Sequence, residues 1–206
     1  MGDTMIYVIL VSLFAYLIGS VSSAVIISKR IFKTDIRNHG SGNAGATNAL
    51  RVFGKKAGAL VFFLDFSKGL LAVVIARCLV AFIDAPYECV LFAGFFAQVG
   101  HTFPVFFKFR GGKGVATAAG AALGVMPLVA LILLALFAFI VLLTKIVSLA
   151  SGICAVAYPL LAYFIGGNNA GYKFIFAASC AVMIAVKHAP NIVRLLDGNE
   201  KKISDR

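Results

Sequence analysis

The stretch that decides the fold is PLVALILLALFAFIVLLTKI, residues 127–146, in which Lys145 is the single charged residue. A helix needs about 20 mainly apolar residues to cross a hydrocarbon core roughly 30 Å thick, and this stretch has that length. In lipid every backbone polar group must be satisfied within its own segment, so an apolar run with no alternating pattern predicts a helix rather than a strand.

Similar apolar runs fill most of the 206 residues, which are 61% hydrophobic and only 13% charged, with a mean hydropathy of +0.98. A soluble domain has about 25% charged residues, so we expect an all-α polytopic membrane protein that forms one domain over residues 1–206. About seven transmembrane helices are predicted, of which 114–125 is too short to span fully and ends at Met126-Pro127, so it is half-length or broken. The predicted segments are 5–28, 57–83, 86–106, 114–125, 127–146, 148–166 and 171–187.

The basic residues lie on one side of such a bundle. All of the 19 Lys and Arg residues except Lys68, Arg77 and Lys173 fall in alternate loops or in the C-terminal tail. The opposite loops hold Asp84 and Glu88 and follow an acidic N-terminus. Because cytoplasmic loops carry the excess of Lys and Arg, the N-terminus is expected to be periplasmic and the C-terminus cytoplasmic.

The basic side also carries a glycine pattern, Gly40-x-Gly42-x-x-Gly45, that has the spacing of a dinucleotide-binding loop. That motif requires a preceding strand and an acidic residue about 20 positions on, whereas this loop follows a membrane helix. A Walker A loop is excluded as well, because Gly112-Lys113 is followed by Gly114 and residue 107 is Phe. No Cys or His spacing indicates a metal site, and we expect neither a metal nor a cofactor.

Glycines nevertheless let backbone N–H groups turn inward around an anion, and nearby cations complete its neutralisation. Two such loops lie on the basic side. The first, residues 39–48, has Arg51 one turn further on if a helix begins near Thr47; the second, residues 109–114, contains Lys113 and opens into a helix whose N-terminus favours anions. The candidate phosphate ligands are Gly42, Asn43, Gly45, Thr47, Asn48, Gly111, Gly112 and Gly114. Two neighbouring anion sites predict two phosphorylated groups.

The tail supplies a third polar element, with His188 and Asn191 three residues apart, although Pro190 leaves the local helix open to question. Arg194 and Glu200 follow, and both are expected to bind substrate or phosphate. His101 either caps a helix or binds phosphate, and Asp65 with Lys68 predicts an intramembrane ion pair that could also orient the site.

Taken together these motifs resemble the bacterial acyl-phosphate–glycerol-3-phosphate acyltransferases, the PlsY family. The resemblance covers nearly the whole chain and rests on residues 41–48 with Arg51, 100–108, 111–117 and 187–202. It implies an enzyme of the cell inner (plasma) membrane with its active site on the cytoplasmic face. The residues that it places in catalysis are Ser41, Arg51, Lys113, His188 and Asn191.

The reaction that the resemblance implies is acyl transfer from a long-chain acyl phosphate to the 1-hydroxyl of sn-glycerol 3-phosphate, giving lysophosphatidic acid and inorganic phosphate. This is the first acylation of phospholipid biosynthesis. Besides these substrates, membrane lipids are the expected partners; no nucleic acid is, and the sequence indicates no oligomeric state. The proton acceptor is either His188 or a substrate phosphate, and Ser41 is either a hydrogen-bond donor or a nucleophile.

Three other functions fit the sequence less well. The His-x-x-x-x-Asp motif of other glycerol-phosphate acyltransferases is absent, because Ala44, Phe106 and Val193 stand five residues after the three histidines. A CDP-alcohol phosphotransferase would need a cluster of aspartates for metals. A transporter of an organic phosphate is the rival outside enzymes, but transporters place polar sites near the bilayer midplane between repeats, whereas these motifs collect at one surface.

Overall fold

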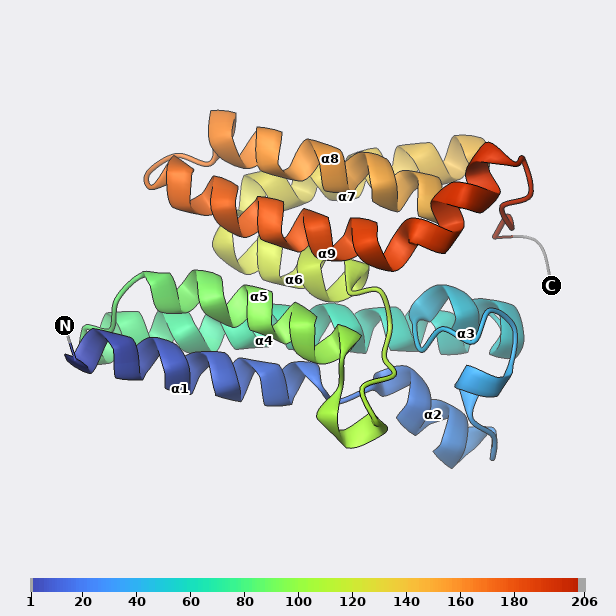
Figure 1. Cartoon of the computed structure of the whole chain (residues 1–206), viewed down its shortest axis with the longest axis horizontal. Helices are drawn as coiled ribbons and strands as arrows, with labels where there is room; N and C mark the ends of the chain where they lie inside the picture. Colours follow the sequence, from blue (N-terminus) through green and yellow to red (C-terminus); the bar gives the residue numbers. More distant parts are fainter. Residues whose placement is uncertain (1, 204–206) are drawn as a thin grey trace.

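A computed structural model describes residues 2–203, in which the long helices run roughly side by side (Figure 1). Within this range the secondary structure is helical, with no strand. The elements are α1 Gly2–Gly19, α2 Ser23–Ile31, η1 Ile36–Asn38, α3 Ala46–Phe53, α4 Lys55–Ile83, α5 Glu88–Thr102, η2 Val105–Phe107, α6 Val115–Val125, α7 Pro127–Thr144, α8 Val147–Ile165 and α9 Ala170–Leu196.

The helices confirm the predicted membrane architecture. Six apolar stretches in the described range are long enough to cross a membrane, and α6 is a shorter apolar helix between them. With its 11 residues, α6 is about 16 Å long at 1.5 Å per residue, roughly half of the hydrocarbon core. The fourth predicted segment is therefore half-length.

Two predicted segments differ from the structure. The predicted segment 5–28 is not one helix, because the helix is interrupted between Gly19 and Ser23. The break is tolerated at this depth because the carbonyl of Val21 accepts a hydrogen bond of 2.8 Å from Lys68 Nζ, so a freed backbone group is satisfied inside the protein. The last segment, predicted to end at residue 187, instead continues through Pro190 to Leu196.

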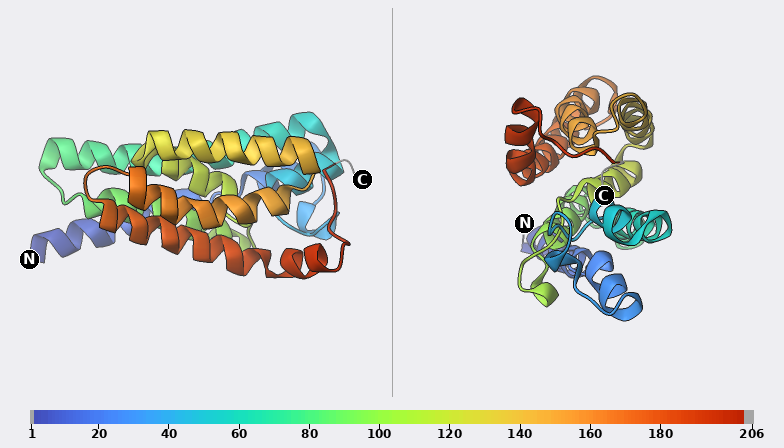
Figure 2. Two further views of the ribbon diagram at one scale, coloured as in Figure 1. Left: turned by 90° about the horizontal axis from the view of Figure 1, so that it is seen from above. Right: turned by 90° about the vertical axis from the view of Figure 1, so that its right-hand side faces the viewer.

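The helices form two groups that α6 joins. Figure 2 shows α1, α4 and α5 on one side of α6 and α7, α8 and α9 on the other. Glycines allow the close α4–α6 contact: a Cβ on Gly69 would lie 2.1 Å from the Thr117 carbonyl oxygen, and one on Gly120 would lie 1.9 Å from that of Phe66. Small residues at helix contacts are typical of membrane proteins, where backbones approach closely.

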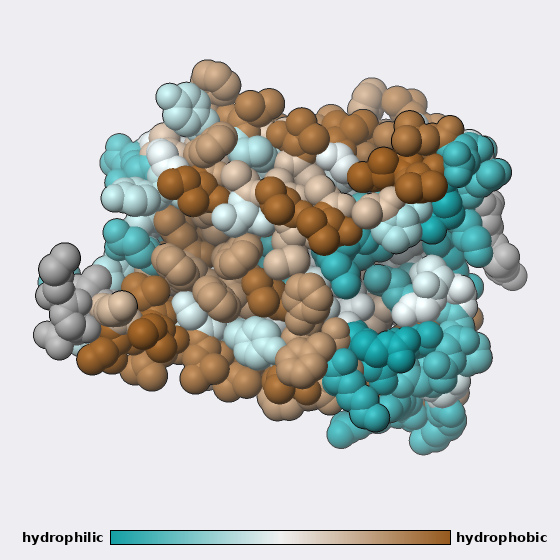
Figure 3. All heavy atoms as spheres, viewed as in Figure 1, coloured by the Kyte–Doolittle hydropathy of each residue, from teal (hydrophilic) through white to brown (hydrophobic). Residues whose placement is uncertain are grey.

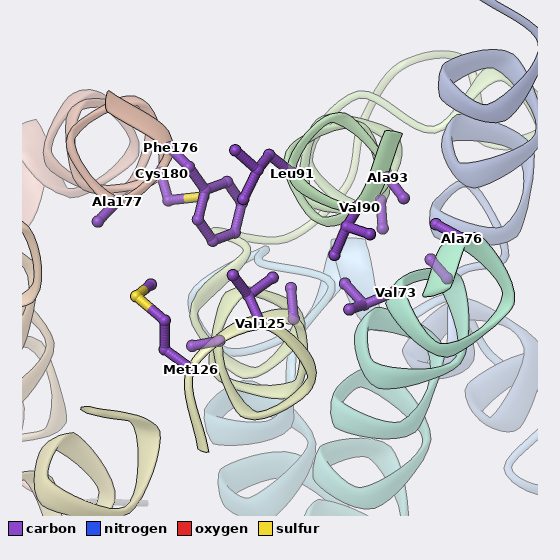
Figure 4. Close-up of a cluster of buried hydrophobic side chains, with 14 of the residues drawn as sticks. Val73, Ala76, Val90, Leu91, Ala93, Val125, Met126, Phe176, Ala177 and Cys180 are labelled. Carbon is purple, nitrogen blue, oxygen red and sulfur yellow. The ribbon is translucent and has the colours of Figure 1, made fainter. Parts of the chain in front are cut away.

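A cluster of buried apolar side chains connects the two groups (Figure 4). Val73 of α4, Val90 of α5 and Val125 of α6 pack there with Phe176 of α9. Because this cluster crosses from one group to the other, it fixes α9 and its polar C-terminal end relative to α4 and α6.

The polar residues gather at one end of the molecule. Hydrophilic residues are densest at the end where α2 and α3 lie, and apolar residues cover the flanks (Figure 3). Exposed side chains such as Leu142, Val156 and Phe164 make the flanks suited to lipid. Helix α9 ends at this polar end, opposite the end at which α1 begins (Figure 1). Both glycine loops and the tail share the polar end.

Candidate active site

The first glycine loop is a short, tightly turned segment between η1 and α3. Gly40 and Gly42 have φ angles of 61° and 71°, which glycine adopts without steric cost. Asn48 braces the loop from within: its Oδ1 accepts from the Ser41 N–H at 2.9 Å, and its Nδ2 donates to the carbonyls of Ile36, His39 and Asn43 at 3.3, 3.0 and 3.0 Å. The Asn48 side chain is buried, and both its amide oxygen and its amide nitrogen make hydrogen bonds to the backbone. Its role in the structure is therefore to stabilise the loop.

The remaining predicted residues of this loop surround the start of α3. Ser41 and Gly42 are exposed at the rim, whereas Asn43, Gly45 and Thr47 are half-buried. Gly45 is the residue before α3, and Arg51 lies in its last turn. The expected helix near Thr47 is confirmed, and it begins at Ala46.

The second glycine loop packs against the first. A Cβ on Gly112 would lie 3.0 Å from the carbonyl oxygen of Ala44, so the two loops touch. Arg37 of η1 also connects them, because it donates to the carbonyl of Phe107 at 2.9 Å while Asp35 holds its guanidinium. Gly114, with φ of 79°, directs the chain from this loop into α6.

Helix α9 brings the third motif to the same place. His188 and Asn191 are both buried on one face of α9, because residues three apart on a helix are neighbours. His188 Nδ1 lies 2.9 Å from the carbonyl oxygen of Ile184. A carbonyl only accepts, so in the neutral imidazole the proton sits on Nδ1, and Nε2 is left with a lone pair.

A hydrogen-bond network centred on Glu200 joins the second glycine loop to α9 and the tail. Its Oε1 accepts from Asn191 Nδ2 at 2.5 Å and from Ser148 Oγ at 2.8 Å. Its Oε2 accepts from Arg194 Nε at 2.8 Å. Lys113 Nζ of the second loop donates to Asn191 Oδ1. The network therefore runs from the second glycine loop through α9 to the tail.

The tail also folds over the first motif. The guanidinium of Arg51 donates to the carbonyls of Lys201 and Lys202 at 3.0 and 3.2 Å. The N–H of Ile203 in turn donates to the carbonyl of Lys145 at 2.7 Å. Arg51 thus faces the same space as Glu200 and Lys113.

The network carries an excess of positive charge. Burial lowers the pKa of Lys113 to about 8; Glu200 opposes this shift, and the cations of Arg194, Arg51 and Lys187 add to it. Burial by itself raises the pKa of Glu200, but hydrogen bonds from Asn191, Ser148 and Arg194 outweigh it and lower the pKa overall. Lys113 thus lies among three further cations, with Glu200 as the opposing carboxylate, and a phosphate would offset their mutual repulsion.

Not every predicted residue reaches this space. His101 is buried on α5 below the second loop, with Nδ1 3.5 Å from Asp65 Oδ1. The predicted Asp65–Lys68 pair is confirmed at 2.9 Å. Ser148 was missed, because a lone serine at the start of an apolar segment gives no signal in the sequence; only the fold brings it to Glu200.

An apolar groove opens next to the network. It holds about 620 Å³ of space, part of it outside the protein envelope, and is lined mainly by α6, α7 and α8. Its lining includes Val115, directly after the second loop, Ser151 of α8, one turn after Ser148, and Ile184, one turn before His188. The site is thus polar at one end and suited to a hydrocarbon chain at the other.

The fold and the site define an integral-membrane protein whose basic site suits phosphorylated groups and whose adjoining groove suits a lipid chain. Comparison with known proteins makes the assignment specific. The family model described as glycerol-3-phosphate acyltransferase matches residues 9–198. A glycerol-3-phosphate acyltransferase of Thermoanaerobacter pseudethanolicus is 45% identical over 200 residues, covering 97% of this chain and 98% of that protein.

Two crystal structures of PlsY, an integral-membrane glycerol 3-phosphate acyltransferase, share the fold. The glycerol 3-phosphate form has a TM-score of 0.85 at 42% identity, covering 95% of this chain and 94% of that chain. The lysophosphatidic acid form has a TM-score of 0.83 at 40% identity, with the same coverage. The chain belongs to the glycerol-3-phosphate acyltransferase family, and it is an acyltransferase rather than a transporter.

Proposed function

We propose that the protein transfers a fatty acyl group from an acyl phosphate to the 1-hydroxyl of sn-glycerol 3-phosphate, giving lysophosphatidic acid and inorganic phosphate. The observation that carries this proposal is the cluster of Arg51, Lys113, Arg194 and Lys187 beside two glycine loops at the mouth of an apolar groove. Each substrate phosphate brings a charge of about −1.5 to −2, so two substrates with a phosphate each match this cationic site. The family members solved with glycerol 3-phosphate and with lysophosphatidic acid support the acceptor and the product.

The apolar groove supports an acyl phosphate as the donor. An acyl phosphate has a charged head and a hydrocarbon chain, and the groove lining includes Val115, two residues after Lys113. Its chain would lie along α6 and α8 while its phosphate faces Lys113. Because an acyl phosphate is already an activated anhydride, no covalent enzyme intermediate is needed, and Ser41 serves as a hydrogen-bond donor.

His188 lies at the junction between the two halves of the site. Ile184, one turn before it, lines the groove, and Asn191, three residues after it, contacts Lys113. The acyl carbonyl must occupy this junction. The acceptor hydroxyl attacks the carbonyl carbon and forms the ester bond, and the bond from that carbon to the phosphate oxygen breaks. The hydroxyl proton passes to His188 Nε2 and then to the leaving phosphate, while Lys113 stabilises the developing negative charge.

The orientation follows from the same charges. Since cytoplasmic loops are enriched in Lys and Arg, the end that carries both glycine loops and the tail faces the cytoplasm, and the protein lies in the plasma membrane. One domain over residues 1–206 carries the activity. Glycerol 3-phosphate then reaches the site from water, and the acyl phosphate enters sideways from the bilayer.

Purified protein in detergent, given labelled glycerol 3-phosphate, tests the donor directly. Acyl phosphate, acyl-CoA and acyl-carrier-protein thioester are supplied in parallel reactions, with the Lys113→Met variant as the matched control. We expect lysophosphatidic acid from acyl phosphate alone, with one inorganic phosphate released per product. Product from a thioester, or product without phosphate release, would overturn the donor assignment.

A further inference from the structure

Three charged or ionisable side chains lie buried below the two glycine loops, outside the network that faces the substrates. Asp65 and Lys68 pair at 2.9 Å on α4, and His101 Nδ1 of α5 lies 3.5 Å from the same Asp65 oxygen. Lys68 also donates to the carbonyl of Val21, in the break between α1 and α2. All three side chains are at most 8% exposed. The pairing offsets part of the cost of burying these charges, and removing one partner would leave the other charge buried without compensation.

The triad touches the site through His101. The N–H of Gly112 donates to the His101 carbonyl at 3.2 Å. The His101 ring lies directly below the same residue: a Cβ on Gly112 would come within 2.2 Å of Nε2. The same Cβ would lie 3.0 Å from the carbonyl oxygen of Ala44 in the first loop, so the imidazole edge and the first loop both pack against this side of Gly112. The His101 imidazole thus supports the second glycine loop at Gly112, and the contact with Asp65 holds the imidazole in position.

The residue after Gly112 is Lys113, whose ammonium group contacts Asn191. A shift of the second glycine loop relative to His101 would therefore move the Lys113 ammonium group, which faces the substrates. His101 itself is covered by Gly112 and held by Asp65, so it acts on the site through the loop rather than by reaching a ligand. At 3.5 Å the contact between His101 Nδ1 and Asp65 Oδ1 is long for a hydrogen bond, and it is an ion pair only when the imidazole is protonated.

We propose that Asp65, Lys68 and His101 form a positioning unit that sets the affinity of the site for phosphate by holding the second glycine loop against the first. This inference rests on the proposed function for its kinetic consequence, but not for its effect on phosphate binding. His101 is a positioning residue and not a catalytic one.

A double-mutant cycle between His101 and Gly112 tests the contact. Gly112→Ala drives a methyl group into the imidazole, so we expect it to lower kcat/KM for glycerol 3-phosphate about a hundredfold, the order of loss that a misplacement of about 1 Å can cause. In a His101→Ala background only the 3.0 Å contact with the Ala44 carbonyl oxygen remains, and the same substitution should cost about threefold or less. His101→Ala alone should raise KM about tenfold and change kcat much less, and it leaves the Asp65–Lys68 pair intact.

Gly111 provides the matched control. A Cβ there would meet the His101 carbonyl oxygen at 2.0 Å and the Pro104 ring at 2.6 Å, and His101→Ala removes neither. Gly111→Ala should therefore cost the same factor in both backgrounds. An equal cost of Gly112→Ala in both backgrounds, or an unchanged KM in His101→Ala, would overturn the proposal.

A second measurement separates this inference from the proposed reaction. The same variants are heated in detergent with and without inorganic phosphate, which protects the folded state in proportion to its affinity. We expect Gly112→Ala to reduce the phosphate-dependent rise in Tm strongly in the unaltered chain and only slightly in the His101→Ala background. If the unaltered chain transfers no acyl group, the proposed function fails and the phosphate cycle still decides the triad; if phosphate gives no protection to the unaltered chain, the triad proposal fails.

Discussion

The low pKa of Lys113 predicts a specific pH dependence of catalysis. Burial and the neighbouring cations lower this pKa to about 8, and only the charged form attracts phosphate. Lys113 is charged below its pKa and loses its charge as the pH rises through it. The charged fraction is about nine tenths at pH 7 and about one tenth at pH 9. Because kcat/KM reports the free enzyme, its value for glycerol 3-phosphate should fall about tenfold over this range.

Two substitutions isolate Lys113 as the titrating group. Lys113→Arg stays charged throughout, since arginine has a pKa above about 12, so its kcat/KM should be flat from pH 7 to pH 9. Its value should be lower than that of the unaltered chain at pH 7, because the guanidinium does not fit the contact with Asn191. Lys113→Met should also be flat, and about thirtyfold lower, since a hydrogen bond from a charged group is worth about 2 kcal/mol.

The assay is the initial rate of lysophosphatidic acid formation in detergent, with saturating acyl phosphate and varied labelled glycerol 3-phosphate. A reaction without protein at each pH corrects for spontaneous hydrolysis of the acyl phosphate. If Lys113→Arg loses kcat/KM in parallel with the unaltered chain, another group titrates, and the reasoning about Lys113 is refuted.

Three further substitutions test other parts of the site. Asn48→Ala removes four hydrogen bonds worth about 1 kcal/mol each, so Tm in detergent should fall by roughly 10 °C; an unchanged Tm would contradict its bracing role. His188→Gln should lower kcat by about 10²–10⁴ with little change in Tm, and near-normal kcat would exclude it as the proton acceptor. Ala119→Leu fills the groove, so turnover of long-chain acyl phosphates should fall more than that of short-chain ones; equal losses would show that the chain lies elsewhere.

The membrane architecture was predictable because the lipid imposes it. Length and the absence of charge identify a helix such as α7 without knowledge of its neighbours. The break after Gly19 was not predictable in this way, because it depends on Lys68, 47 residues away in the sequence, for the hydrogen bond to Val21. The continuation of α9 beyond Pro190 was likewise missed, since that end of the helix is held by contacts of Asn191 and Arg194 with Glu200.

The sequence indicated which polar motifs the fold would bring together, but not the contacts that each residue makes. The glycine loops and the tail motif were identified by residue type, and the structure brings them to one end of the molecule. What each residue contacts depends on tertiary structure: Asn48 turns inward to brace its own loop, and His101 lies below the second loop. Ser148 joins the network only because α8 begins beside the tail.

The most direct test of the central claim is an experimental structure of the protein with glycerol 3-phosphate and a non-hydrolysable acyl phosphonate bound together. We predict phosphate or phosphonate oxygens within hydrogen-bond distance of Arg51 and Lys113, and a hydrocarbon chain in the groove between α6 and α8. The acceptor hydroxyl should lie beside His188 Nε2. Headgroups bound away from Lys113, or a chain outside the groove, would contradict the account.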